Sequence, residues 1–194
     1  IGIYLKPRDL KVIDILSRFR LVRESTLHQL FFPTIKEQRN VQSKLKRLVE
    51  HSYIGRRFLP IIRSKEFIDF THQKRRDTIY FLGPDGAELL NREYDSKLAE
   101  IKIPYLYHRL DISDIQACLE LALQQTKGIL LAAWYDENEK DEDGNFLLHD
   151  DVYIEDTATR KKRRLPLRPD ACFILEREDT GRQDFFFLEI DEGT

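Results

Sequence analysis

The sequence of 194 residues lacks several features that mark common classes of protein. It has no run of 18 apolar residues, which excludes a transmembrane helix, and Lys6, Pro7 and Arg8 interrupt the start of the chain, which has no signal-peptide core. Two cysteines and five scattered histidines give neither a disulfide framework nor a zinc-ligand pattern. We therefore expect a cytoplasmic protein without a membrane partner, in which Cys118 and Cys172 are buried thiols.

Glycine is also scarce, and its pattern excludes two further classes of site. There are eight glycines and no G-x-x-x-x-G-K segment, so the sequence has no phosphate-binding P-loop. No nucleophile elbow of the hydrolase type is present. His108 stands at the start of an expected helix, where a structural cap or a buried hydrogen bond is favoured over catalysis.

Charge, in contrast, is abundant and unevenly divided. Residues 1–80 carry 18 Lys/Arg and 8 Asp/Glu, whereas residues 81–194 carry 14 Lys/Arg and 26 Asp/Glu. This division indicates two units with different partners. The basic half suits a polyanion such as nucleic acid, and the acidic half suits a divalent cation. The alternative is that both are ordinary solvated surfaces.

The basic half predicts three helices followed by a hairpin. Apolar residues recur at three- and four-residue spacing over 8–20, a short helix over 24–32 ends before a proline, and a third helix covers 35–50. Two β-prone runs, 53–62 and 78–82, flank a polar and basic loop. This order is typical of a winged helix-turn-helix domain.

The third helix, which Thr34 and Glu37 begin as a capping box, has two different faces. Its apolar residues fall in one sector. The opposite side carries long cations and short hydrogen-bonding groups, namely Lys36, Arg39, Asn40, Ser43, Lys46 and Arg47. We expect this side to enter the major groove of DNA, unless it is simply solvated. The expected base readers are Arg39, Asn40, Ser43 and Arg47, and the expected phosphate contacts are Lys36 and Lys46 with Lys74, Arg75 and Arg76 of the wing.

The acidic half predicts a connector over 94–104, a helix over 105–128 and a buried strand over 129–135. We interpret residues 136–164 as an exposed, partly disordered excursion, with one short strand at 146–148. The excursion ends in the basic run Arg160–Arg164. This run is expected either to contact phosphate or to neutralise the acidic stretch before it.

A second hairpin is expected where two β-prone runs, 165–175 and 185–191, flank a turn. Asp170 stands at the start of one strand, and Glu189 and Asp191 stand near the end of the other, on one face because side chains alternate. Three adjacent carboxylates are most easily kept ionised by Mg²⁺ or Mn²⁺, which can activate water. The alternative is three exposed acids at strand ends.

The sequence Pro169-Asp170, a strand, and then Glu189-x-Asp191 resembles the PD-(D/E)xK nuclease core. The resemblance implies that the Asp and the Glu bind a metal ion and that a lysine two residues after the Glu orients the attacking water. Asp191 occupies that lysine position here. A lysine is then supplied from elsewhere, or the site binds metal without cutting, or it is vestigial.

The winged-helix order is followed by Tyr107-His108-Arg109-Leu110, by the segment around Asp170 and by the segment from Phe187 to Thr194. Together these features resemble the replication-relaxation family of plasmid and integrative-element proteins. Some members of that family assist a relaxase at a transfer origin. The resemblance implies an α+β chain with a winged helix-turn-helix domain at 1–95. At 96–194 it implies a PD-(D/E)xK restriction-endonuclease-like α/β domain, which we expect to be incomplete because that fold normally continues with another helix and strand.

The function implied is that of a double-stranded DNA-binding accessory protein of plasmid or mobile-element replication and mobilisation. Its implied partners are duplex DNA, a relaxase or replication proteins, and a second copy of the chain, with Mg²⁺ or Mn²⁺ as cofactor. One alternative is a metal-dependent endonuclease or nickase in which Asp170, Glu189 and Asp191 are catalytic. Others are a winged-helix transcriptional regulator with a non-catalytic second domain, and a protein-interaction module indifferent to DNA.

Overall fold

The chain is a mixed α+β protein, as the sequence predicts. The computed structural model describes residues 3–32, 34, 41–59, 78–155 and 160–191. The chain divides into two compact units, Ile1–Ala117 and Cys118–Thr194, and the division falls inside helix α6 (Ile103–Gln125). None of the helices in the described ranges has the length and apolarity needed to cross a bilayer.

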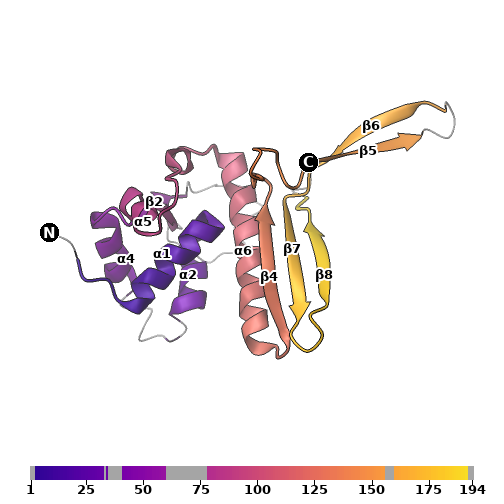
Figure 1. Cartoon of the computed structure of the whole chain (residues 1–194). Coiled ribbons are helices and arrows are strands. Elements are labelled where there is room, and N and C mark those ends of the chain that lie inside the picture. Colours follow the sequence, from indigo (N-terminus) through magenta and orange to yellow (C-terminus); the bar gives the residue numbers. More distant parts are fainter. Residues whose placement is uncertain (1–2, 33, 35–40, 60–77, 156–159, 192–194) are drawn as a thin grey trace, which may run out of the picture. The chain divides into compact units, whose positions relative to one another are not determined.

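The first unit combines helices with one small sheet (Figure 1). Its elements are α1 (Pro7–Phe19), β1 (Leu21–Arg23), α2 (Glu24–Phe31), α4 (Val41–Glu50), β2 (Ile54–Phe58), β3 (Thr78–Leu82), α5 (Pro84–Leu89), the 3-10 helix η1 (Ser96–Ala99) and the first part of α6. The three strands form an antiparallel sheet in the order β1-β3-β2. The predicted helices and the strand at 78–82 are therefore present, whereas β1, with only three residues, is too short to give a periodic pattern.

Several residues of the predicted DNA-binding surface lie outside the described part of the chain. They are Lys36, Arg39 and Asn40 before α4, and Lys74, Arg75 and Arg76 between β2 and β3; Glu37 of the predicted capping box lies outside it as well. The described part of the third helix begins at Val41.

The sheet of the first unit is covered on both faces, so all five residues of β3 are buried. On one face, Tyr80 and Leu82 pack against a core formed by α1, α2 and α4. On the other face, Ile79 and Phe81 pack against α6. Gly55 lies opposite Phe81, and a Cβ atom at that position would lie 2.1 Å from the Phe81 ring, so only glycine fits there. A central strand that is apolar throughout is the expected result of burial on two faces.

Polar contacts hold α6 against the start of α2. The Arg23 guanidinium donates to Asp114 over 2.7 Å and to Asp111 over 2.9 Å, and the Thr26 hydroxyl donates to Asp114 over 2.6 Å. Burial acts to lower the pKa of Arg23, but the two carboxylates outweigh it and raise the pKa. The Ser113 hydroxyl also donates to the carbonyl of Phe19 over 2.9 Å. Together these bonds fix the first half of α6 relative to α1 and α2.

The second unit contains an antiparallel three-stranded sheet and a separate two-stranded hairpin (Figure 1). Its strands are β4 (Ile129–Asp136), β5 (Asp150–Glu155), β6 (Lys162–Leu167), β7 (Ala171–Arg177) and β8 (Gln183–Leu188). The sheet has the order β4-β7-β8, and β5 pairs only with β6. Across the sheet the rings of Trp134, Phe173 and Phe186 stack in a row, with centroids 5.6 and 5.0 Å apart.

Several expectations for the acidic half are wrong, among them the burial of Cys118, which is exposed, whereas Cys172 is buried as expected. β4 is not a buried strand, since Leu130 is 37% exposed and the burial alternates along it, as in an antiparallel sheet with one solvated face. Residues 146–148 form no strand, because Phe146 makes only an isolated bridge with Lys140. The excursion instead contains the regular hairpin β5–β6, in which oppositely charged runs at 150–151 and 160–164 obscure the apolar pattern of the strands.

Candidate nucleic-acid interface

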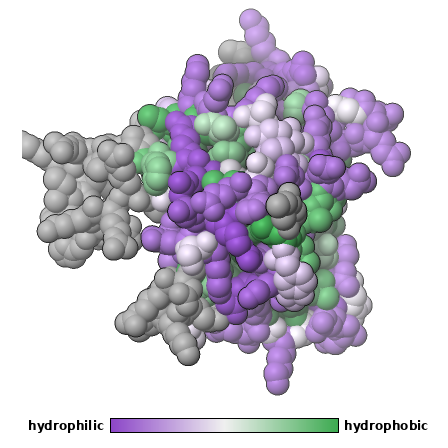
Figure 2. Space-filling view, turned by 90° about the vertical axis from the view of Figure 1, so that its left-hand side faces the viewer, coloured by the Kyte–Doolittle hydropathy of each residue, from purple (hydrophilic) through white to green (hydrophobic). Residues whose placement is uncertain are grey.

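Helix α4 has one buried side and one exposed side. Val41, Leu45 and Leu48 are fully buried in the core, and each buried leucine contributes about 2 kcal/mol by leaving water. The helix therefore directs Gln42, Ser43, Lys46 and Glu50 to solvent. The side of the first unit where α4 lies is mostly hydrophilic, with smaller apolar patches between (Figure 2).

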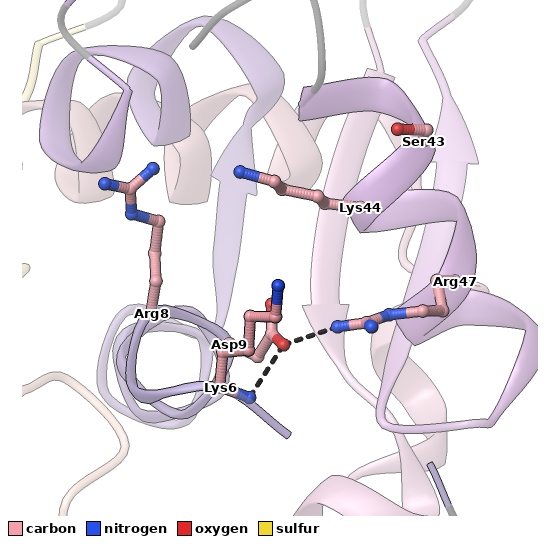
Figure 3. A pocket seen from close by; sticks show the side chains of 6 residues that line it. All are labelled: Lys6, Arg8, Asp9, Ser43, Lys44 and Arg47. Carbon is pink, nitrogen blue, oxygen red and sulfur yellow. Dashed lines mark hydrogen bonds and ion pairs between the residues drawn. The ribbon is translucent and has the colours of Figure 1, made fainter. Parts of the chain in front are cut away.

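A pocket of about 300 Å³ lies between α4 and the first turn of α1 (Figure 3). Its lining residues come from the two helices and from the N-cap of α1, and are Lys6, Arg8, Asp9, Ser43, Lys44 and Arg47. Four cations and one carboxylate give the lining a formal charge of +3. A concave site lined by one sign of charge concentrates the field and attracts a counter-ion, here an anion.

Asp9 organises one wall of this pocket. Its buried carboxylate accepts from the backbone N–H of Lys6 over 3.0 Å and from Nη2 of Arg47 over 2.5 Å. Figure 3 shows Arg47 reaching from α4 toward Asp9 on α1. Pro7 at the start of α1 lacks the N–H that a first-turn residue would leave unpaired. The Asp9 carboxylate thus links Arg47 of α4 to the N-terminal end of α1.

Phe32 orders two other cations of the pocket. Its buried ring has the Arg8 guanidinium carbon 5.2 Å and the Lys44 ammonium 5.4 Å from its centroid. In Figure 3 Arg8 and Lys44 extend toward each other from the two helices. Cation–π contacts at such distances contribute about 0.5–1 kcal/mol at exposed sites. They also restrict two long side chains, which reduces the entropy lost when an anion binds.

Glu24 connects α2 to α4 and to the sheet. One carboxylate oxygen accepts from Nε2 of Gln42 over 3.2 Å, and the other accepts from the hydroxyl of Tyr80 over 3.2 Å. Burial and then the negative charge of Glu24 raise the pKa of Tyr80. These bonds fix the position of α4 relative to the rest of the unit.

Strand β2 carries a further cation. Arg57 is committed to structure, because its Nη1 donates to the carbonyl of Ile101 over 2.7 Å. Arg56 points the other way, is exposed, and lies 5.7 Å from the centroid of the exposed Phe58 ring. An exposed arginine next to an aromatic ring on this strand is a chemically suitable contact for a phosphate.

The sequence-predicted residues within the described part fall into different environments. Ser43 is exposed and lines the pocket, Lys46 is exposed and pairs with Glu50 over 3.6 Å, and Arg47 is 37% exposed and bonded to Asp9. The sequence interpretation missed Lys6, Arg8, Lys44 and Arg56. Lys44 is adjacent to Ser43 in the sequence, but the approach of Lys6 and Arg8 to α4 is a tertiary contact with no local signal.

The three carboxylates predicted to bind metal lie in the second unit. Asp170 is buried before β7, its N–H donates to Leu188 over 3.0 Å, and its Oδ2 accepts from the N–H of Ile190 over 2.7 Å. Strand β8 ends at Leu188, so the alternation expected to place Glu189 and Asp191 on one face does not extend to them. Both are exposed. Within the described residues there is no group of three or more His, Cys, Asp or Glu suited to a metal ion.

A fourth carboxylate, that of Asp136, lies at the same end of the β4-β7-β8 sheet as Asp170. Asp136 at the end of β4 pairs with Ala171, the residue after Asp170, and is also buried. Its Oδ1 accepts from the N–H of Asn138 over 2.9 Å. Asp136 and Asp170 therefore stabilise the ends of neighbouring strands through backbone N–H groups.

Comparisons with known proteins give one result. A family model described as Replication-relaxation matches residues 13–194. No curated protein and no solved structure matches the chain.

Proposed function

The chain belongs to the replication-relaxation family, and on that premise we propose that it is a double-stranded DNA-binding accessory protein of plasmid or mobile-element replication and mobilisation. The observation that carries this proposal is the pocket in which four cations from α1 and α4 surround a space large enough for a phosphate group. A cationic concavity beside an exposed helix face is suited to the backbone of duplex DNA.

In this proposal the first unit is a winged helix-turn-helix domain. The order α1-β1-α2-α4 followed by the β2–β3 pair supports that assignment. Helix α4 is the recognition helix, and the connection between β2 and β3 is the wing.

The side chains have two different tasks. Lys44, Arg8 and Lys6 hold phosphate at the pocket, and Arg56 holds phosphate near the wing. Ser43 and Lys46, on the exposed side of α4, face the groove. Arg47 lines the pocket and is less available to contact bases, because its guanidinium donates to Asp9. The proposal retains Arg39 and Asn40 as base readers and Lys36, Lys74, Arg75 and Arg76 as phosphate contacts.

We extend the proposal to the second unit as a PD-(D/E)xK nuclease-like module that docks a relaxase or replication protein. Asp170, Glu189 and Asp191 are the residues that would hold Mg²⁺ or Mn²⁺ there. The support is the sequence motif, together with the fact that Asp170 and Glu189 are the chain neighbours of the last register pair of β7 and β8, Ala171 with Leu188. A second copy of the chain is a further proposed partner.

A charge-reversal pair with a matched control tests the DNA interface. Lys44→Glu/Lys46→Glu reverses two cations of α4, and Lys97→Glu/Lys102→Glu makes the same charge change at exposed residues elsewhere in the first unit. We expect the α4 pair to lower duplex affinity by roughly 100-fold and the control pair to lower it by less than about tenfold. Fluorescence anisotropy with a labelled duplex measures both. Equal losses of duplex affinity in the two variants would show that α4 is not part of the DNA interface.

A further inference from the structure

The strands β5 and β6 form a hairpin that is not hydrogen-bonded to the other sheets of the described structure. Its six register pairs run from Asp150 with Leu167 to Glu155 with Lys162, and neither strand pairs with a third. A two-stranded ribbon alone is marginally stable in water, so its retention of a regular register favours a partner surface.

Both faces of this ribbon expose apolar side chains. Val152 and Ile154 project on one face, and Tyr153, which is 66% exposed, projects on the other because side chains alternate along a strand. Apolar side chains exposed together mark an interaction site rather than a folded interior. A partner that contacts the ribbon on two sides, as the walls of a groove do, would cover both sets of side chains.

Charge on the ribbon is concentrated where β6 begins. Five consecutive cations occupy residues 160–164, and all are exposed. Two of them have acidic neighbours across the hairpin, since Arg164 pairs with Asp151 and Arg160 lies 3.8 Å from Glu155. In the described part of the hairpin, no ion pair involves Lys161, Lys162 or Arg163.

The remaining cations lie on both sides of the ribbon. In the register, Lys162 shares a face with Glu155, and Arg163 shares the opposite face with Ile154. A polyanion that surrounds the ribbon would satisfy both, whereas a flat acidic surface would satisfy only one. The major groove of B-DNA is about 12 Å wide and admits a two-stranded ribbon, with phosphates along both walls.

We propose that the β5–β6 ribbon is a second DNA-binding element, which inserts into a groove of duplex DNA and holds the flanking phosphates with Lys161, Lys162 and Arg163. Tyr153 and Ile154 contact the groove floor or the sugars between those phosphates. This site lies in the second unit and goes beyond the proposed role of α4. It gives the chain two separate contacts with duplex DNA.

The first test compares two triple variants of the full chain. Lys161→Gln/Lys162→Gln/Arg163→Gln neutralises the ribbon, and Lys127→Gln/Arg177→Gln/Arg182→Gln removes the same charge from exposed residues elsewhere in the second unit. The slope of log K against log[NaCl] measures the number of phosphate contacts, because each contact contributes about −0.9 to the slope. We expect the ribbon variant to reduce the slope of log K against log[NaCl] by about 2 to 3, and the control to leave it within about 0.5 of the parent value.

The second test uses a site-specific photo-cross-linker and does not depend on charge. Tyr153→p-benzoylphenylalanine places the probe on the ribbon, and Phe185→p-benzoylphenylalanine places it on β8, where the parent side chain is 61% exposed. We expect irradiation with duplex DNA to link position 153 to DNA and to leave position 185 unlinked. An unchanged salt slope in the ribbon variant, or no cross-link from position 153 while the parent chain binds DNA, would overturn the inference. Either result would leave the α4 proposal intact and turn attention to a protein partner for the ribbon.

Discussion

Arg47 on α4 and Asp9 on α1 form an ion pair in which guanidinium Nη2 lies 2.5 Å from carboxylate Oδ2. The Asp9 side chain is buried, whereas Arg47 is partly open to solvent. The pair joins two helices whose cations line the pocket, so it affects both the stability of the unit and the charge of the proposed interface.

The first prediction separates these two effects. Asp9→Asn removes the negative charge and weakens the bonds from Arg47 and Lys6, and we expect the free energy of unfolding to fall by about 1–2 kcal/mol. Duplex affinity should not fall, because the formal charge of the pocket lining rises by one. Urea denaturation and DNA titration of one preparation measure the two quantities. Loss of DNA affinity in a folded Asp9→Asn protein would show that positioning of Arg47 matters more than charge.

A second prediction concerns the polar contacts of α6 with β1 and α2. Asp114 accepts from Arg23 and Thr26, whereas Asp111 accepts from Arg23 alone among the described residues and is more exposed. We therefore expect Asp114→Ala to destabilise the protein by about 1.5–3 kcal/mol and Asp111→Ala by less than about 1 kcal/mol. Midpoints of urea unfolding compare the two variants. The reverse order would mean that Arg23 is held mainly through Asp111.

The third prediction follows from the raised pKa of Tyr80. The folded protein holds the phenolic proton more tightly than the unfolded chain, whose tyrosine has a pKa near 10.0. This difference in proton binding stabilises the folded protein fully below pH 10.0, and the stabilisation is lost as the pH rises from 10.0 toward the pKa of Tyr80 in the folded protein. Tyr80→Phe should cost about 0.5–1.5 kcal/mol at neutral pH and should lose less stability than the parent protein above pH 10. Unfolding curves on both sides of that pH test this, and parallel losses in the two proteins would contradict it.

The sequence predicts the elements whose pattern is local. Helix α1 and strand β3 were found because apolar residues repeat along each with the period of its own structure. Strand β1 was missed because three residues carry no period. The hairpin β5–β6 was missed because charged residues dominate its ends and cross-strand pairing, rather than apolar alternation, defines it.

The site was predicted less completely than the fold. The faces of one helix are enough to predict Ser43, Lys46 and Arg47 as members of the candidate site. The bond from Arg47 to Asp9 could not be predicted in this way, because it joins residues 38 positions apart in the chain. The same holds for Arg8, which shares the ring of Phe32 with Lys44. Contacts of this kind depend on how helices pack, which local spacing does not encode.

The fourth prediction concerns the proposed metal site. Calorimetric titration of the full chain with Mn²⁺ should release or absorb heat, and Asp170→Asn should abolish this signal, since Asp170 is the central proposed ligand. Asp184→Asn, at a half-buried acid of the same hairpin that pairs with Arg182, is the matched control and should leave the signal unchanged. The absence of a signal in the parent protein would contradict the metal proposal and leave Asp170 with its structural bond to Ile190.

Duplex-DNA binding by the cationic pocket is tested by measuring the affinity of the full chain for duplex DNA as NaCl rises from about 50 to about 200 mM. If Lys6, Arg8, Lys44 and Arg56 each neutralise a phosphate, the slope of log K against log[NaCl] is about −4 or steeper, and affinity falls roughly 200-fold over this range. Failure to bind duplex DNA at the lowest salt, or affinity that does not change with salt, would contradict the account.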